Sequence, residues 1–101
     1  MNSHLMIDID QVFSSAVNNI EKDKLKLSPD SQLIFYGLYQ QAMYGDNNKS
    51  RPLCCYSEKT VKYEAWLRFK NMSKYDAKIL YINTYQMIYG ENSKLNKLSI
   101  I

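Results

Sequence analysis

The chain has 101 residues, which is enough for one domain with a modest hydrophobic core. Hydrophobic residues make up 46% of it, and three Gly with two Pro supply too few turns for a β-sandwich or barrel, so a few long elements are favoured. The net charge of +3 suits an anionic ligand but is not the dense basic stripe of a duplex-DNA binder, so we expect no nucleic acid as partner.

The first predicted helix begins at Asp8 or Asp10, either of which can cap it. Its apolar residues recur three or four positions apart, which indicates one face of an amphipathic helix. They are Ile9, Val12, Phe13, Ala16, Val17 and Ile20. The charged run over 21–27 is predicted to end this helix and to begin a link.

A second helix is predicted from Ser28 and Pro29 to about Tyr44. Serine can accept a hydrogen bond from the free amides of a first turn, and proline suits the first helical position. Gly45 can adopt the left-handed conformation that ends a helix. The polar segment 46–52 closes with a proline and is predicted to be a loop that extends to residue 56.

Two more helices are predicted in the second half of the chain. One starts at Ser57 and Glu58 and should stop near Asn71. The other starts at Ser73, three residues before an aspartate as in a capping-box variant, and runs to Gly90. We therefore expect one all-α domain over residues 8–90, followed by a tail over 91–101 that is helical at first and frayed later.

The chain lacks the residue sets of several catalytic classes. His4 is the only histidine, and Cys54 with Cys55 are the only cysteines, so neither a Cys–His pair nor a zinc pattern is expected. The three glycines stand too far apart for a phosphate-binding loop. We interpret Asp8 and Asp10 as a helix start rather than as catalytic carboxylates. The inventory favours binding without catalysis, metal or cofactor.

The sequence also bears on the compartment in which the protein is expected. The segment 1–6 has no basic region followed by an apolar run, so no secretory signal is expected. No stretch approaches the length of a membrane span, and we expect no stable insertion into membranes. The cytoplasm is the expected compartment.

The most informative segment is the second helix. On a helix Tyr36, Tyr39, Gln40 and Met43 fall on one face, which combines phenols, an amide and a thioether. Taken alone, the tyrosines have an ordinary interpretation as half-buried packing and Lys62 as solvated surface. Periodicity by itself therefore predicts only a helical domain with a tyrosine-rich face.

The combined pattern is more specific, and it matches the order and spacing of a known family from about residue 13 to residue 88. It comprises Tyr36-x-x-Tyr39-x-Gln41-Ala42-x-x-Gly45-Asp46, then Arg51-Pro52, then Lys62-Tyr63-x-Ala65-Trp66, then Ser73, Ala77 and Tyr81-Ile82. With these residues the chain resembles the acyl-CoA-binding protein family. The resemblance implies a four-helix up-down-down-up bundle without enzymatic activity.

The resemblance also implies a function and its partners. Members bind long-chain acyl-CoA esters and act as an intracellular pool and transporter for them. We therefore expect this chain to bind medium- to long-chain fatty acyl-CoA and to act as an intracellular pool former and transporter. We expect a monomer that exchanges its ligand with enzymes that use acyl-CoA. On the acyl side, the resemblance implies that Tyr36 hydrogen-bonds near the acyl carbonyl, that Leu33 and Val61 flank the acyl chain, and that Val17 lies near the bound ligand.

At the nucleotide end, the resemblance implies that Lys62 meets a phosphate and that Tyr39 and Tyr81 hold the nucleotide, with Tyr81 stacked on adenine. Gln40 stands where the family usually has a lysine that meets the ribose 3′-phosphate, and Glu21 and Glu58 also occupy positions that are often basic. A neutral amide lacks the charge that strengthens such bonds.

These departures leave a second hypothesis open. The chain is then a helical protein-interaction module that kept the scaffold but binds the ligand weakly. Under the first hypothesis we expect that Tyr81→Ala and Lys62→Ala each weaken binding without unfolding the protein.

Overall fold

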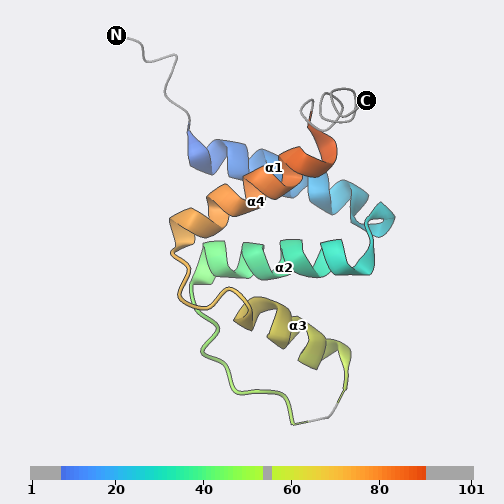
Figure 1. Cartoon of the computed structure of the whole chain (residues 1–101), viewed down its shortest axis with the longest axis vertical. Coiled ribbons are helices and arrows are strands. Elements are labelled where there is room, and N and C mark those ends of the chain that lie inside the picture. Colours follow the sequence, from blue (N-terminus) through green and yellow to red (C-terminus); the bar gives the residue numbers. More distant parts are fainter. Residues whose placement is uncertain (1–7, 54–55, 91–101) are drawn as a thin grey trace, which may run out of the picture.

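The computed structural model describes residues 8–53 and 56–90. Its helices are α1 (Ile9–Asp23), a short 3-10 helix η2 (Lys24–Lys26), α2 (Pro29–Tyr44), α3 (Glu58–Leu67) and α4 (Lys74–Tyr89). In Figure 1, α1 and α4 run in one direction and α2 and α3 run in the other. The predicted all-α, up-down-down-up bundle is therefore confirmed for the part of the chain that the structure describes.

Local signals in the sequence explain where the helices begin. Each α-helix starts after a side-chain oxygen that accepts a backbone N–H of the first turn, as capping requires. The capping residues are Asp8, Ser28, Ser57 and Ser73. Pro29 occupies the first position of α2, and Gly45 ends that helix with a φ of 80°. These starts and this end were all predicted.

The end of α3 differs from the prediction. The helix stops at Leu67 instead of near Asn71. The next residues form tighter turns, in which Phe69 and Lys70 each donate their N–H to the carbonyl three residues earlier. Asn71 then adopts a positive φ of 76°, which a continuing helix does not allow.

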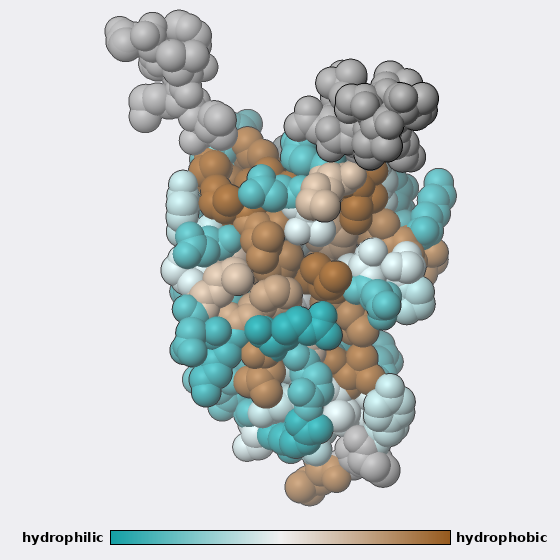
Figure 2. All heavy atoms as spheres, viewed as in Figure 1, coloured by the Kyte–Doolittle hydropathy of each residue, from teal (hydrophilic) through white to brown (hydrophobic). Residues whose placement is uncertain are grey.

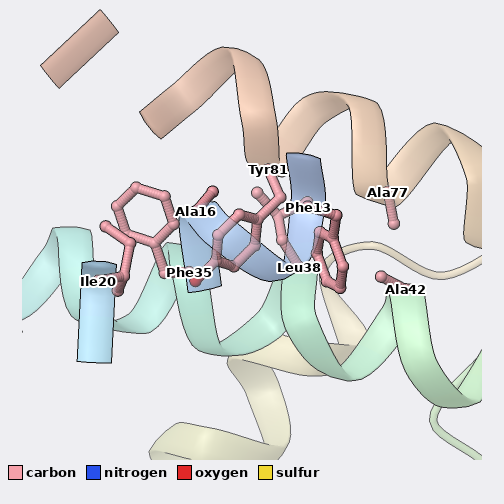
Figure 3. Close-up of a cluster of buried hydrophobic side chains, with 8 residues drawn as sticks. All are labelled: Phe13, Ala16, Ile20, Phe35, Leu38, Ala42, Ala77 and Tyr81. Carbon is pink, nitrogen blue, oxygen red and sulfur yellow. The ribbon is translucent and has the colours of Figure 1, made fainter. Parts of the chain in front are cut away.

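The core lies between α1, α2 and α4, and Figure 3 shows its side chains. Its members are buried hydrophobic residues, namely Phe13, Ala16, Ile20, Phe35, Leu38, Ala42, Ala77 and Tyr81. The Tyr81 ring of α4 is the centre of the aromatic contacts: its centroid lies 5.1 Å from the Phe13 ring of α1 and 4.9 Å from the Phe35 ring of α2. Tilted and edge-on aromatic pairs of this kind add to the stability gained from burial.

The third helix packs on α2 through a close backbone approach. Gly37 of α2 is buried, and a Cβ built on it would lie 2.3 Å from the carbonyl oxygen of Ala65 on α3. Any side chain at position 37 would therefore push the two helices apart. Glycine at this position keeps α2 and α3 in contact.

Figure 2 shows apolar side chains at the surface between the helices, with hydrophilic ones around them. Among the helices that the structure describes, none is long and apolar enough to cross a membrane. His4, both cysteines and the predicted tail over 91–101 lie outside the described residues.

Candidate functional site

A cleft of about 660 Å³ opens between α1, η2, α2 and α3, with one residue from α4. Its size is typical of sites for small organic ligands. The lining residues come from every α-helix of the bundle and are mostly apolar or aromatic. They are Val17, Ile20, Glu21, Lys24, Pro29, Gln32, Leu33, Phe35, Tyr36, Tyr39, Glu58, Val61, Lys62 and Tyr81. We call this the cleft.

Seven of the eight residues predicted for ligand binding line the cleft together. They are Val17, Leu33, Tyr36, Tyr39, Val61, Lys62 and Tyr81. These residues are spread over 65 positions of sequence, from α1 to α4, so only the fold brings them together. What each contributes to binding stays a prediction.

Gln40 is the predicted residue that the cleft does not include. It lines a second cavity of about 350 Å³, together with Asp46, Lys49 and Trp66 among others. Gln40 follows Tyr39 on α2 and is rotated from it by about 100°, as in any α-helix, and the two neighbours line different cavities. Tyr36 and Gln40 are one helical turn apart, so the expected face of Tyr36, Tyr39 and Gln40 spans about 100° of α2 and borders both cavities.

Lys62 lies between two partners at the cleft. Its Nζ is 5.3 Å from the centroid of the Tyr36 ring, within the range of a cation–π contact. The same Nζ lies 3.4 Å from Oε2 of Glu58, one turn earlier on α3. The side chain of Lys62 is 46% exposed, so its charge is accessible from solvent.

A second ion pair lines the cleft where α1 passes into η2. Nζ of Lys24 lies 3.2 Å from Oε1 of Glu21, and both side chains are more than half exposed. Exposed pairs of this kind contribute little to folding. The i,i+3 and i,i+4 spacings of the two pairs are visible in the sequence, but the pairing of Glu21 with Lys24 and of Glu58 with Lys62 in one cleft was not predicted from it.

Tyr81 takes part in both the core and the cleft. The residue is only 2% exposed, and the Phe13 and Phe35 rings pack against its ring. Burial raises the pKa of the Tyr81 phenol, and the nearby Glu21 and Tyr39 raise it further. The hydroxyl therefore remains protonated and able to donate. The predicted stacking on adenine stays a prediction, and it would need more of the ring surface than is exposed here.

Several residues of the family-like pattern have a structural role that was not predicted from the sequence. Gln41 is fully buried, and its Nε2 donates to Oδ1 of Asp46 at 2.8 Å and to the carbonyl of Met72 at 2.7 Å. Oδ1 of Asp46 also accepts the N–H of Asn71 at 2.7 Å. The hydrogen bonds that Asp46 accepts lower the pKa of its carboxyl, and the bond from Gln41 lowers it more than the bond from Asn71.

The indole of Trp66 completes this arrangement, because its Nε1 donates to the carbonyl of Gly45 at 2.9 Å. We call Gln41, Gly45, Asp46 and Trp66 the clasp. It joins the C-terminal end of α2 to α3 and to the turn before α4. The sequence offered only the helix-ending glycine as a signal for it, because the partners of Gln41 and Trp66 are distant in the chain.

Comparisons with known proteins agree with this fold. The family model described as "Acyl CoA binding protein" matches residues 10–85. An acyl-CoA-binding protein of Dictyostelium discoideum is 38% identical over 76 residues, which cover 75% of this chain and 90% of that protein. An acyl-CoA-binding protein of Saccharomyces cerevisiae is 35% identical over 85 residues, covering 84% and 98%.

A solved structure extends the likeness to three dimensions. The crystal structure of acyl-CoA-binding protein 2 of Oryza sativa superposes with a TM-score of 0.73 at 28% sequence identity, covering 86% of this chain and 97% of that one. The family model, the relatives and the fold therefore agree. The chain belongs to the acyl-CoA-binding protein family.

Proposed function

We propose that this protein binds medium- to long-chain fatty acyl-CoA esters and acts as an intracellular acyl-CoA pool former and transporter. The observation that carries the proposal is the meeting of seven predicted binding residues in one cleft of suitable size. Membership of the family supports the same ligand.

The cleft has the chemistry that an acyl-CoA needs. Val17, Leu33 and Val61 give it apolar walls, and burial of an acyl chain against them would contribute about 0.8 kcal/mol for each methylene. The Tyr36 hydroxyl is proposed to hydrogen-bond near the acyl carbonyl. The ammonium group of Lys62, which lies over the same ring, is proposed to meet a phosphate.

The nucleotide is proposed to be held by Tyr39 and by the hydroxyl of Tyr81, both of which line the cleft. Gln40 remains a candidate contact for the ribose phosphate only if the ligand reaches the second cavity, where Lys49 supplies a positive charge.

We further propose that the protein is a carrier rather than an enzyme. It would need no cofactor, and it would work as a monomer in the cytoplasm, where it would exchange acyl-CoA with the enzymes that use it. Both carboxylates of the cleft are paired with lysines, which supports a role in charge balance rather than in proton transfer.

The direct test is calorimetric titration of the protein with octanoyl-CoA and palmitoyl-CoA. Both should bind, and palmitoyl-CoA should bind more tightly because it buries more methylenes. The absence of binding to both ligands would overturn the proposal and would favour a helical protein-interaction module. The paired lysines of the cleft are the observation that keeps this second function in view.

Lys62→Ala tests the proposed phosphate contact. We expect octanoyl-CoA to bind about three- to tenfold more weakly, because one half-exposed cation is lost from a site for a polyanion. Lys74→Ala is the matched control: it removes the same charge from the first turn of α4, at the end of the bundle away from the cleft. Equal affinities of the two variants would show that Lys62 does not contact the ligand.

A further inference from the structure

The cleft contains as many negative as positive side chains. Among its lining residues that the structure describes, Lys24 and Lys62 carry positive charge, and Glu21 and Glu58 carry negative charge. A CoA ester has several phosphate charges, so a site with this balance offers little net attraction for it. The two glutamates must therefore affect how the cleft binds an anion.

Glu58 is the clearer of the two cases. Its Oε2 lies 3.4 Å from Nζ of Lys62, and the same Nζ also contacts the Tyr36 ring. The Glu58 side chain is 82% exposed, so burial does not hold it in place. A solvated pair of this kind is weak and can be exchanged for another anion at small cost.

We propose that Glu58 is an affinity-determining residue that competes with the ligand phosphate for Lys62. In the free protein the carboxylate neutralises Lys62. When acyl-CoA binds, a phosphate oxygen takes the place of the carboxylate at Nζ, and Glu58 turns to solvent. The pair thereby weakens the hold on the nucleotide end while leaving the hold on the acyl chain unchanged. This inference rests on the proposed function.

The same argument applies to Glu21 and Lys24 with less force. Their pair has a shorter distance, 3.2 Å, and Glu21 also acts on the Tyr81 phenol. A change at Glu21 therefore alters two properties of the cleft at once. Glu58 is the position where the competition can be measured alone.

The experiment compares Glu58→Gln with Glu64→Gln by titration with octanoyl-CoA. Glu64 lies on the same helix and also forms an ion pair, with Arg51, but it does not line the cleft. Both variants change the net charge equally and keep the side-chain shape. We expect Glu58→Gln to bind about two- to fivefold more tightly than the unmodified protein, with no change for Glu64→Gln.

The dependence on Lys62 is tested in the Lys62→Ala background. If Glu58 acts by occupying Lys62, adding Glu58→Gln to Lys62→Ala should raise the affinity for octanoyl-CoA by a much smaller factor than the same change does in the unmodified protein. If Glu58→Gln raised the affinity equally in that background, Glu58 would act by repelling the ligand directly, and the proposed competition would be overturned.

The remaining outcomes separate this inference from the function on which it rests. If the unmodified protein binds octanoyl-CoA and Glu58→Gln binds it equally or more weakly, only the role of Glu58 is overturned. If Glu64→Gln gains as much as Glu58→Gln, the effect is one of overall charge, and the inference is again overturned. If the unmodified protein binds neither octanoyl-CoA nor palmitoyl-CoA, the proposed function itself fails.

Discussion

Two residues of α2 (Pro29–Tyr44), Tyr36 and Gln41, use their polar groups in opposite ways. The N-terminal half faces the cleft, and there Tyr36 lies under a lysine whose ion pair is largely solvated. The C-terminal half leads into the clasp, where the fully buried Gln41 donates two hydrogen bonds within the protein. Tyr36 leaves its polar group accessible to a ligand, and Gln41 uses its amide within the protein.

This difference separates residues that the sequence pattern presents as equivalent. Tyr36 and Gln41 belong to the same short motif, five positions apart. Loss of a hydrogen bond in the interior leaves a buried partner unsatisfied, whereas loss of one at an open cleft lets water take its place. Changes in the clasp should therefore lower stability, and changes in the cleft should lower affinity.

The largest expected effect comes from Tyr81, which belongs to the core as well as to the cleft. Tyr81→Ala should lower the free energy of unfolding by about 3–5 kcal/mol, because it removes a buried aromatic ring and leaves a cavity. Urea denaturation followed by circular dichroism measures this loss. The burial of Tyr81 corrects the sequence-based expectation that this variant would test binding without affecting the fold.

Tyr81→Phe is the appropriate variant for binding, because it keeps the ring and removes only the hydroxyl. Its midpoint of urea denaturation should lie close to that of the unmodified protein. If Tyr81→Ala were as stable as Tyr81→Phe, the assignment of this ring to the core would be wrong.

Gln41→Ala should have the next largest effect and should separate the role of Gln41 from that of Tyr36. We expect a loss of about 1–3 kcal/mol in the free energy of unfolding, because a fully buried side chain is removed and the carbonyl of the partly buried Met72 loses its donor, whereas water can take the place of Gln41 at the exposed Asp46. Affinity for octanoyl-CoA, measured well below the unfolding transition, should stay unchanged. Gln11→Ala, at an exposed position of α1, is the control. A change in affinity without a change in stability would contradict the structural role of Gln41.

A smaller effect should appear at low pH through Asp46. Its folded-state pKa lies below the ordinary 3.8, so its carboxylate stabilises the fold above that value. This contribution is lost as the pH falls through the lowered pKa. The thermal midpoint of the unmodified protein should therefore drop between about pH 5 and about pH 2, and Asp46→Asn should drop less.

Asp30→Asn provides the comparison for this pH series. Asp30 lies exposed in the first turn of α2, away from the clasp, and the variant removes one carboxylate in the same way. An Asp30→Asn variant that loses as much acid sensitivity as Asp46→Asn would show that the clasp is not the source.

The helix starts could be predicted because their signals are local. Ser28, Ser57 and Ser73 each cap the turn that follows them in the chain. The end of α3 could not be predicted, because the turn at Asn71 is fixed by a hydrogen bond to Asp46, 25 residues earlier. Local patterns cannot indicate such a partner.

The site divides in a similar way. Periodicity alone indicated a tyrosine-rich face, and only the resemblance to a family gathered Val17, Lys62 and Tyr81 into one set. The structure places these residues in one cleft but puts Gln40 in another cavity. The depth of Tyr81 was also not predictable, since the rings that cover it come from two other helices.

The contact between Gly37 and Ala65 holds α2 and α3 close together at one point. Leu33 lies one turn before Gly37 and Val61 one turn before Ala65, and both line the cleft. In Figure 1 the ribbons of α2 and α3 run in the same direction and diverge from this contact toward their N-termini. Under the proposed function, this contact stops an acyl tail from passing further between α2 and α3, because the two backbones leave no room. A chain that is too long for the space before the contact must extend outward at the N-terminal ends of the two helices.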